Sequence, residues 1–382
     1  MPFDRVERYL LNELRSKLQP NKVLILYGAR RVGKTALIKE LITQFSQQEV
    51  LLLNGEDNDA VQLLENQSIA NYKKLLSGKT LLVIDEAQQV KDVGKKLKLM
   101  VDELPGLRIV ATGSSVFDLS NKLGEPLVGR KSTLHLFPLA QMELQQYENA
   151  LQTKANLEER LVYGSYPELL HLPELKQKQD YLTELTDSYL LKDILAYEGI
   201  RKANKIHDLL RLLAYQLGKE VSTLELSNNL NGISRNTIEQ YLDLLTKVFV
   251  VYPVSGYSNN LRKEVSKSKR WYFYDNGIRN AVIRNFNLLA IRNDVGELWE
   301  NYLSGERIKF QSYKDMPSNN YYWRTYDQQE LDWVEETNRT LHAYEFKWNE
   351  RKKTKAPAAW TKGYPDATFE VISPDNYLDW IV

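Results

Sequence analysis

The sequence of 382 residues contains no cysteine, no long apolar run and almost no net charge. The lack of cysteine excludes disulfides, thiolate zinc sites and a cysteine nucleophile, so its chemistry must use oxygen and nitrogen groups. No run reaches the roughly 20 apolar residues of a membrane span, and the charged residues 1–5 do not resemble a signal peptide. We therefore expect a cytoplasmic protein without membrane contact. Because the net charge is +1, binding of nucleic acid would need a local basic segment.

The length is too great for one hydrophobic core, because chains beyond roughly 250 to 300 residues usually split into domains. Hydrophobic residues make up 43% and charged residues 26%, so we expect the chain to fold throughout. The spacing of apolar residues changes three times along the chain. These changes predict four domains, at residues 1–138, 139–205, 206–284 and 285–382.

The first domain has the pattern of an α/β fold. Five apolar runs alternate with mostly helical stretches, at residues 22–27, 50–53, 81–84, 109–112 and 132–136. Such a pattern is typical of a parallel sheet wrapped by helices. Residues 139–205 have helical spacing throughout, which predicts a helical lid.

The strongest motif is Gly28-Ala-Arg-Arg-Val-Gly33-Lys34-Thr35, which fits G-x4-G-K-[ST] between an apolar strand and a helix. The glycines allow the backbone amides to surround a phosphate, Lys34 reaches the β- and γ-phosphates, and Thr35 binds Mg²⁺. The motif therefore predicts a site for ATP and magnesium.

A second motif, Leu81-Leu-Val-Ile-Asp85-Glu86, places two acids at the end of a buried strand. That edge of an open α/β sheet is where ligands bind. Together with the P-loop, it predicts that Asp85 holds magnesium and that Glu86 is the catalytic residue that polarises the attacking water.

Two weaker candidates follow. Ser114 comes after the strand at 109–112 and could contact the γ-phosphate, although an ordinary Gly-Ser turn explains it equally well. Arg130 is a candidate catalytic arginine for the γ-phosphate, acting in its own subunit or donated to a neighbour in a homo-oligomer. A surface salt bridge is the alternative for Arg130.

These motifs, together with Ala111-Thr-Gly-Ser-Ser115 and Tyr163-Gly-Ser-Tyr-Pro-Glu168, resemble the prokaryotic AAA+ ATPases that carry a C-terminal DUF4143 domain. The resemblance covers nearly the whole chain. It implies a P-loop AAA+ core, a winged helix-turn-helix in the middle, and a small C-terminal α/β domain related to PD-(D/E)xK nucleases.

The middle of the chain also has helix-turn-helix spacing by itself. A helix near 221–230, a turn at 231–234 and a helix at 235–247 are followed by a loop with Arg262, Lys263 and Lys267. Residues 201–290 contain 14 Lys and Arg against 7 Asp and Glu. Basic charge next to a recognition-type helix favours DNA binding, whereas a plain packing module is the alternative.

Near the C-terminus, strands at 330–334 and 343–347 flank a short turn. A symmetric turn at Asn338-Arg339 would set Asp332 opposite Glu345, with Lys347 on the same face. Two such carboxylates could share a magnesium ion and Lys347 could act on the attacking water. The resemblance implies that Glu297 joins this metal site from the preceding helix. Solvated charges on an ordinary amphipathic strand are the alternative.

Two functions therefore stay open. The chain is either an ATPase with an ATP-gated, metal-dependent nuclease site, or an ATP-driven switch whose C-terminal domain only binds nucleic acid or a protein partner. Asp332 and Glu345 favour the nuclease, whereas the weak family-level evidence for cutting favours the switch. The sequence does not identify the nucleic acid, the partner or the pathway.

Overall fold

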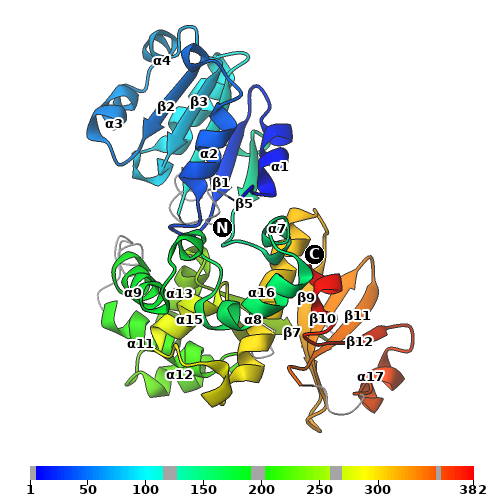
Figure 1. Ribbon diagram of the computed structural model, residues 1–382. Helices are drawn as coiled ribbons and strands as arrows, with labels where there is room; N and C mark the ends of the chain where they lie inside the picture. Colours follow the sequence, from blue (N-terminus) through cyan, green and yellow to red (C-terminus); the bar gives the residue numbers. More distant parts are fainter. Residues whose placement is uncertain (1–5, 115–126, 191–202, 259–268, 350–353) are drawn as a thin grey trace. The chain divides into compact units, whose positions relative to one another are not determined.

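Figure 1 shows the computed structural model of the chain, which describes residues 6–114, 127–190, 203–258, 269–349 and 354–382. The chain forms two compact units. The N-terminal unit comprises the described parts of 7–137 together with 247–249, and the C-terminal unit comprises the described parts of 138–246 and 250–382. Nearly all of the predicted lid, middle domain and C-terminal domain thus lies within one unit.

The N-terminal unit contains a five-stranded parallel sheet in the order β2-β3-β4-β1-β5. Its strands are β1 (Val23–Tyr27), β2 (Val50–Asn54), β3 (Leu81–Asp85), β4 (Arg108–Gly113) and β5 (Lys131–His135). All of β1 and residues 81–84 of β3 are buried, because a parallel sheet with helices on both faces has no side toward water. The predicted α/β core is confirmed, and each predicted strand end is right to within one residue.

Five helices of this unit precede or follow these strands. They are α1 (Leu10–Lys17), α2 (Lys34–Ile42), α3 (Asn58–Glu65), α4 (Ile69–Leu75) and α5 (Val93–Glu103). Figure 1 shows α2 close to β1, and α3 and α4 beyond β2. Because the strands are parallel, the loops after β1, β3 and β4 all leave from the same edge of the sheet.

The C-terminal unit begins with helices and also ends with one. The helices are α7 (Gln141–Leu144), α8 (Ala150–Tyr163), α9 (Leu175–Glu184), α11 (Ala203–Tyr215), α12 (Thr223–Asn229), α13 (Arg235–Lys247), α15 (Asn276–Val282), α16 (Val295–Tyr313), α17 (Ala358–Gly363) and α18 (Tyr377–Ile381). The side-chain amide of Asn276, at the start of α15, donates to the backbone carbonyls of Leu161 on α8 and Leu298 on α16. Helices of the predicted lid and of the predicted C-terminal domain are therefore joined through α15.

A seven-stranded mixed sheet runs through this unit in the order β12-β11-β10-β9-β7-β8-β6. The strands are β6 (Glu220–Val221), β7 (Val251–Gly256), β8 (Lys269–Phe273), β9 (Asn319–Arg324), β10 (Glu330–Thr337), β11 (Thr340–Phe346) and β12 (Thr368–Ile372). β7 and β9 pair in parallel, through Ser255 with Tyr321 and Gly256 with Tyr322. The predicted border at residue 284 is thus bridged by one continuous sheet.

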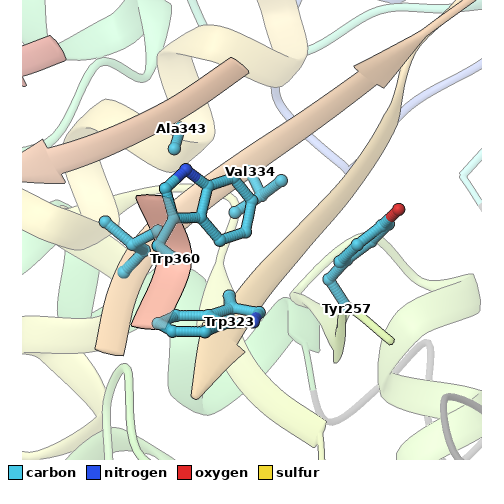
Figure 2. Packing of buried hydrophobic residues seen from close by; sticks show 6 residues of the cluster. Tyr257, Trp323, Val334, Ala343 and Trp360 are labelled. Atoms are coloured by element: carbon cyan, nitrogen blue, oxygen red, sulfur yellow. The ribbon is translucent and has the colours of Figure 1, made fainter. Parts of the chain in front are cut away.

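Aromatic side chains fill the core on one face of this sheet (Figure 2). Trp360 on α17 is 1% exposed and lies 5.2 Å from Trp323 on β9 between ring centroids. The buried cluster consists of Tyr257, Trp323, Leu331, Val334, Ala343 and Trp360. Rings tilted against one another at such distances add about 0.5–1.5 kcal/mol per pair beyond the burial of their area.

The Tyr163–Glu168 segment has a structural role in this unit. The backbone amide of Ser165 donates to Asp275, with 2.7 Å between nitrogen and Oδ2. Asp275 is buried and also caps α15 by accepting from the amides of Gly277 and Ile278. A Cβ at Gly164 would lie 2.0 Å from the Asp275 carboxylate. The glycine therefore leaves room for a buried carboxylate that three backbone amides satisfy.

Within the described parts of the chain, no helix has both the length and the apolar character needed to cross a membrane.

Candidate nucleotide-binding site and C-terminal carboxylate cluster

The loop between β1 and α2 has the backbone that a phosphate cradle requires. Gly33 has a φ of +98°, which disfavours a side chain. A Cβ at Gly28 would lie 2.3 Å from the carbonyl oxygen of Leu136. Lys34 is 5% exposed, and its ammonium group donates to the carbonyls of Gly28, at 2.9 Å, and Ala29, at 3.1 Å. The loop therefore holds a nearly buried cation against its own backbone, next to the start of α2.

Thr35 and Asp85 lie side by side at the edge of the sheet. The Thr35 hydroxyl donates to Asp85, with 2.7 Å between Oγ1 and Oδ2. The other carboxylate oxygen of Asp85 accepts from the hydroxyl of Thr112 on β4. Hydroxyl and carboxylate oxygens are the donors that Mg²⁺ prefers, so these residues fit a magnesium ion that enters with a nucleotide.

Glu86 follows Asp85 in a left-handed backbone conformation, with a φ of 50°. Its amide donates to Thr112 Oγ1 at 3.0 Å. A non-glycine residue in this conformation costs on the order of 1–3 kcal/mol and persists where its surroundings fix it. The conformation turns Glu86 toward the P-loop, where its Oε1 lies 3.9 Å from the ammonium group of Lys34.

Gln88 links Glu86 to Ser114. Its Nε2 lies 2.5 Å from Oε2 of Glu86 and 3.3 Å from Oγ of Ser114. Gln88 and Ser114 are each 4% exposed. Ser114 therefore lies beside the candidate catalytic carboxylate rather than in an isolated turn. Thr112 and Gln88 were not among the candidate site residues, although Thr112 lies within the segment 111–115 and Gln88 follows Glu86 by two residues.

His135 is a partly buried neighbour of this site at the end of β5. Burial, with a smaller effect from the charge of Lys34, lowers the pKa of His135 to about 3. The imidazole is therefore neutral at physiological pH. Of the two neighbours His135 and Lys34, it is Lys34 that carries the positive charge.

Arg130 is not part of this site within its own chain, and the prediction that it could act there is wrong. Its carbonyl accepts from the amide of Val23, at the amino end of β1, whereas the P-loop leaves from the carboxyl end. Arg130 precedes His135 by five residues, which is roughly 16 Å at about 3.3 Å per strand residue. Its side chain pairs with Asp102 at 2.7 Å, and both are partly exposed. The salt-bridge alternative describes the arginine within one chain.

Arg8 supports the P-loop from outside the predicted motifs. It is 7% exposed, and its guanidinium donates to the carbonyl of Val32 at 2.6 Å and to that of Phe137 at 2.7 Å. One charged group thereby joins the loop to the segment that follows β5. No spacing rule could have revealed this role, since a single arginine in an N-terminal helical pattern carries no signal.

In the C-terminal unit, β10 and β11 pair in the predicted register, from Trp333 with Tyr344 to Thr337 with Thr340. Asn338 and Arg339 form the turn, both with positive φ. Asp332 and Glu345 are the next positions in this register, and Oδ2 of Asp332 accepts from the amide of Phe346 at 2.8 Å. The predicted pairing of these strands is confirmed.

The predicted metal set of Glu297, Asp332 and Glu345 is not formed. In the described part of the chain, no three or more His, Cys, Asp or Glu side chains are grouped so that they could hold a metal ion. The charge of Glu297 acts on Arg279. Glu300, three residues further along α16, is the helix carboxylate on which the charge of Asp332 acts. Helical spacing alone could not distinguish two acids that lie on neighbouring positions of one helix surface.

Burial changes the acidity of this carboxylate cluster. Burial and then the charge of Asp332 raise the pKa of Glu300 to about 8 and that of Glu345 to about 7. Burial likewise raises the pKa of Asp332. Lys347 lies 2.6 Å from Glu345, between Nζ and Oε1.

The two helices predicted in the middle of the chain correspond to α12 and α13. On α13, Ile238, Leu242 and Leu245 are buried, whereas Arg235, Asn236, Glu239 and Gln240 are exposed. β6, β8 and β7 form antiparallel pairs beside them. The basic residues Arg262, Lys263 and Lys267 lie outside the described residues.

Three family models match separate parts of the chain. An AAA domain matches residues 20–145, the domain of unknown function DUF8612 matches 154–289, and the domain of unknown function DUF4143 matches 295–373. The AAA match contains the P-loop, Asp85, Glu86 and Ser114. The DUF4143 match begins with α16 and contains the carboxylate cluster.

Curated relatives include three uncharacterised proteins that are each 26% identical to this chain. That of Methanocaldococcus jannaschii covers 73% of this chain and 68% of its own length. The match to the Haemophilus influenzae protein covers 72% of this chain and 73% of that protein. The match to the Mycobacterium tuberculosis protein covers 87% of this chain and 72% of that protein.

Among solved structures, a signal transduction ATPase with numerous domains from Pyrococcus horikoshii aligns with a TM-score of 0.32 and 12% identity, over 81% of this chain and 47% of its own. AMPPCP-bound DnaA from Aquifex aeolicus aligns with a TM-score of 0.30 and 15% identity, over 62% of this chain and 84% of the DnaA chain. Structural similarities of this size carry no argument. The family matches identify the domains, and the chain accordingly combines an AAA domain at residues 20–145 with a C-terminal DUF4143 domain at residues 295–373.

Proposed function

We propose that this protein binds ATP with Mg²⁺, hydrolyses the γ-phosphate, and uses the nucleotide as a switch for a DNA-binding C-terminal unit. The observation that carries the ATPase part is the arrangement at the edge of the parallel sheet. There the Thr35 hydroxyl contacts Asp85, and Glu86 faces Lys34 at 3.9 Å. Four side chains with the chemistry of phosphate binding, metal binding and water activation meet at one place.

In this proposal, the amides of the P-loop and the ammonium group of Lys34 bind the phosphates. Thr35 and Asp85 hold the magnesium ion, which neutralises phosphate charge when bound. Glu86 orients the attacking water and accepts its proton. Gln88 and Ser114 position the Glu86 carboxylate, and the Ser114 hydroxyl senses the γ-phosphate.

Arg130 enters the proposal only as a residue donated to a neighbouring copy. Its place at the opposite edge of the sheet excludes it from the site of its own chain, yet its guanidinium is 43% exposed. A homo-oligomer in which Arg130 reaches the neighbour's γ-phosphate is therefore part of the proposal. An arginine used in this way stabilises the charge of the transition state.

DNA binding is supported by the exposed polar face of α13 and by the basic composition of residues 201–290. We infer that α12, α13 and β6–β8 act as a winged helix. Arg235 and the basic residues of the loop at 262–267 then contact phosphates of the DNA. In this proposal the DUF4143 domain binds nucleic acid or a protein partner but does not cleave nucleic acid, because Glu297 is not grouped with Asp332 and Glu345. This corresponds to the ATP-driven switch rather than the gated nuclease.

The DNA-binding part is tested by replacing Arg262, Lys263 and Lys267 with Ala. Each lost phosphate contact reduces the salt slope of binding by about one. Fluorescence anisotropy with duplex DNA at several salt concentrations should show weaker and less salt-dependent binding, while ATP turnover without DNA persists. Replacement of Lys73, Lys74 and Lys98, which are exposed on the N-terminal unit, removes the same charge and should leave DNA affinity unchanged. If the unchanged protein shows no salt-dependent binding to the DNA, the proposed phosphate contacts are refuted.

A further inference from the structure

Four carboxylates of the C-terminal unit form a cluster, and one buried arginine contacts three of them. Glu300 lies on α16, Glu330 and Asp332 on β10, and Glu345 on β11, whereas Arg270 comes from β8. Arg270 is 4% exposed. The strand that carries it belongs to the middle of the chain, so this residue reaches the DUF4143 domain only because β7 joins β8 to β9 in one sheet.

The guanidinium of Arg270 contacts three of the four acids. Its Nη2 lies 2.9 Å from Oε2 of Glu330, and its Nη1 lies 3.5 Å from Oε1 of Glu300 and 3.9 Å from Oδ1 of Asp332. The same group stacks over the ring of Tyr322 at 4.5 Å. A planar cation is thus held in place by both charge and an aromatic face.

Oxygens of these carboxylates also accept from other internal donors. The hydroxyl of Tyr272 donates to Oε1 of Glu300 at 2.6 Å, and the amide of Phe346 donates to Oδ2 of Asp332. Lys347 donates to Oε1 of Glu345 at 2.6 Å. A divalent cation in this cluster would need these oxygens for itself, since Mg²⁺ and Mn²⁺ are bound through several oxygen ligands. The donors present compete with it for the same atoms.

We propose that the guanidinium of Arg270 takes the place of a divalent cation in this cluster, so that the DUF4143 domain of this protein is metal-free and does not hydrolyse nucleic acid. The two cationic groups, Arg270 and Lys347, face four acids. Burial, and then the charge of Asp332, raises the pKa values of Glu300 and Glu345, so that protons add to the neutralisation of the cluster.

The proposal predicts that removal of the guanidinium creates a metal site. Arg270→Gln leaves the carboxylates without their cation, and the full-length variant should bind Mn²⁺ in the absence of nucleotide. We expect its Mn²⁺ affinity to exceed that of the unchanged protein about tenfold or more, a difference in the range seen when the surroundings of metal ligands are altered. Its melting temperature should fall without metal and rise again with Mn²⁺.

The matched control is Arg279→Gln. Arg279 is also buried, at 3% exposure, and pairs with Asp294 at 2.5 Å in the same unit. This variant should lose stability without recovery by Mn²⁺, because among the described residues Arg279 forms its ion pair with a single acid, Asp294. Adding Asp332→Asn to Arg270→Gln should abolish the new Mn²⁺ binding, which separates the cluster from any metal held near Thr35.

Electron paramagnetic resonance of Mn²⁺ and thermal melting measure these outcomes without an activity assay and without ATP. A folded Arg270→Gln protein that binds no more Mn²⁺ than the unchanged protein would overturn the proposal. Mn²⁺ binding by the unchanged protein that disappears in Asp332→Asn would overturn it as well. If Arg270→Gln does not fold, this second comparison decides alone, and equal Mn²⁺ binding by the two proteins supports the proposal.

Discussion

The side-chain amide of Gln88 donates a hydrogen bond to the carboxylate of Glu86, with 2.5 Å between Nε2 and Oε2. The same nitrogen lies 3.3 Å from the hydroxyl of Ser114. A carboxylate that must orient a water molecule loses rate when it can turn away, because near-attack geometry contributes a large part of the rate enhancement of enzymes. The contact therefore assigns Gln88 the role of a positioning residue.

Replacement of Gln88 by Leu should lower kcat for ATP hydrolysis by about tenfold and leave the Kd for ATP unchanged, since the side chain acts on the hydrolytic step only. Gln89→Leu is the matched control, because Gln89 is the adjacent and exposed glutamine. Steady-state phosphate release and calorimetric titration with a non-hydrolysable ATP analogue give the two quantities. Equal losses of kcat in both variants would argue against the role of Gln88.

Substitution of Gly164 by Ala should destabilise the C-terminal unit by about 3 kcal/mol or more. Gly164 has a φ of +75°, and a Cβ there would lie 2.0 Å from Oδ1 of Asp275. Gly296→Ala serves as the control, because a Cβ at Gly296 meets nothing within 4 Å. Urea unfolding followed by tryptophan fluorescence compares the two. A loss below about 1 kcal/mol for Gly164→Ala would show that Asp275 does not need this space.

The stability of the C-terminal unit should fall as the pH rises from about 5 to about 8. Burial and Asp332 raise the pKa of Glu300 from 4.5 to about 8, in a setting that also contains Arg270, Tyr272 and Glu330. The folded state therefore binds a proton more tightly than the unfolded state. This contribution is fully present below the unfolded pKa and is lost as the pH passes through the folded value.

Glu300→Gln removes that titration and should flatten the decline, which is at most about 1.4 kcal/mol per pH unit for one proton. The free energy of unfolding, measured by urea titration across this pH range, tests the effect. Glu336→Gln, a substitution at a partly exposed glutamate of β10, should leave the slope as it is. An unchanged slope in Glu300→Gln would place the titrating group elsewhere.

Local patterns in the sequence predicted the parts of the structure that depend on neighbours along the chain. The five strands of the parallel sheet follow from their apolar runs, and in β1 and β3 these runs are buried on both faces. The register of β10 and β11 follows from a two-residue turn at Asn338 and Arg339. Such turns fix strand pairing through geometry within a few residues.

Relationships between distant segments could not be obtained in this way. The position of Arg130 depends on its place before the amino end of β5, at the edge of the sheet opposite the P-loop, and on its pairing with Asp102. The choice of Glu300 over Glu297 depends on the orientation of α16, and Arg270 enters the cluster only through the order of strands in a sheet. Each of these requires tertiary structure, for which one sequence contains no spacing signal.

The central claim is that Glu86 acts on water while Lys34 binds phosphate, and paired measurements on Glu86→Gln and Lys34→Ala test it most directly. Calorimetry with Mg²⁺ and ATP, alongside phosphate release, should show that Glu86→Gln binds ATP at close to the unchanged affinity but turns over at least about a hundredfold more slowly. Lys34→Ala should lose tight binding, since it removes a ground-state phosphate contact. Hydrolysis by Glu86→Gln at the unchanged rate, or ATP binding by Lys34→Ala at the unchanged affinity, would contradict the account.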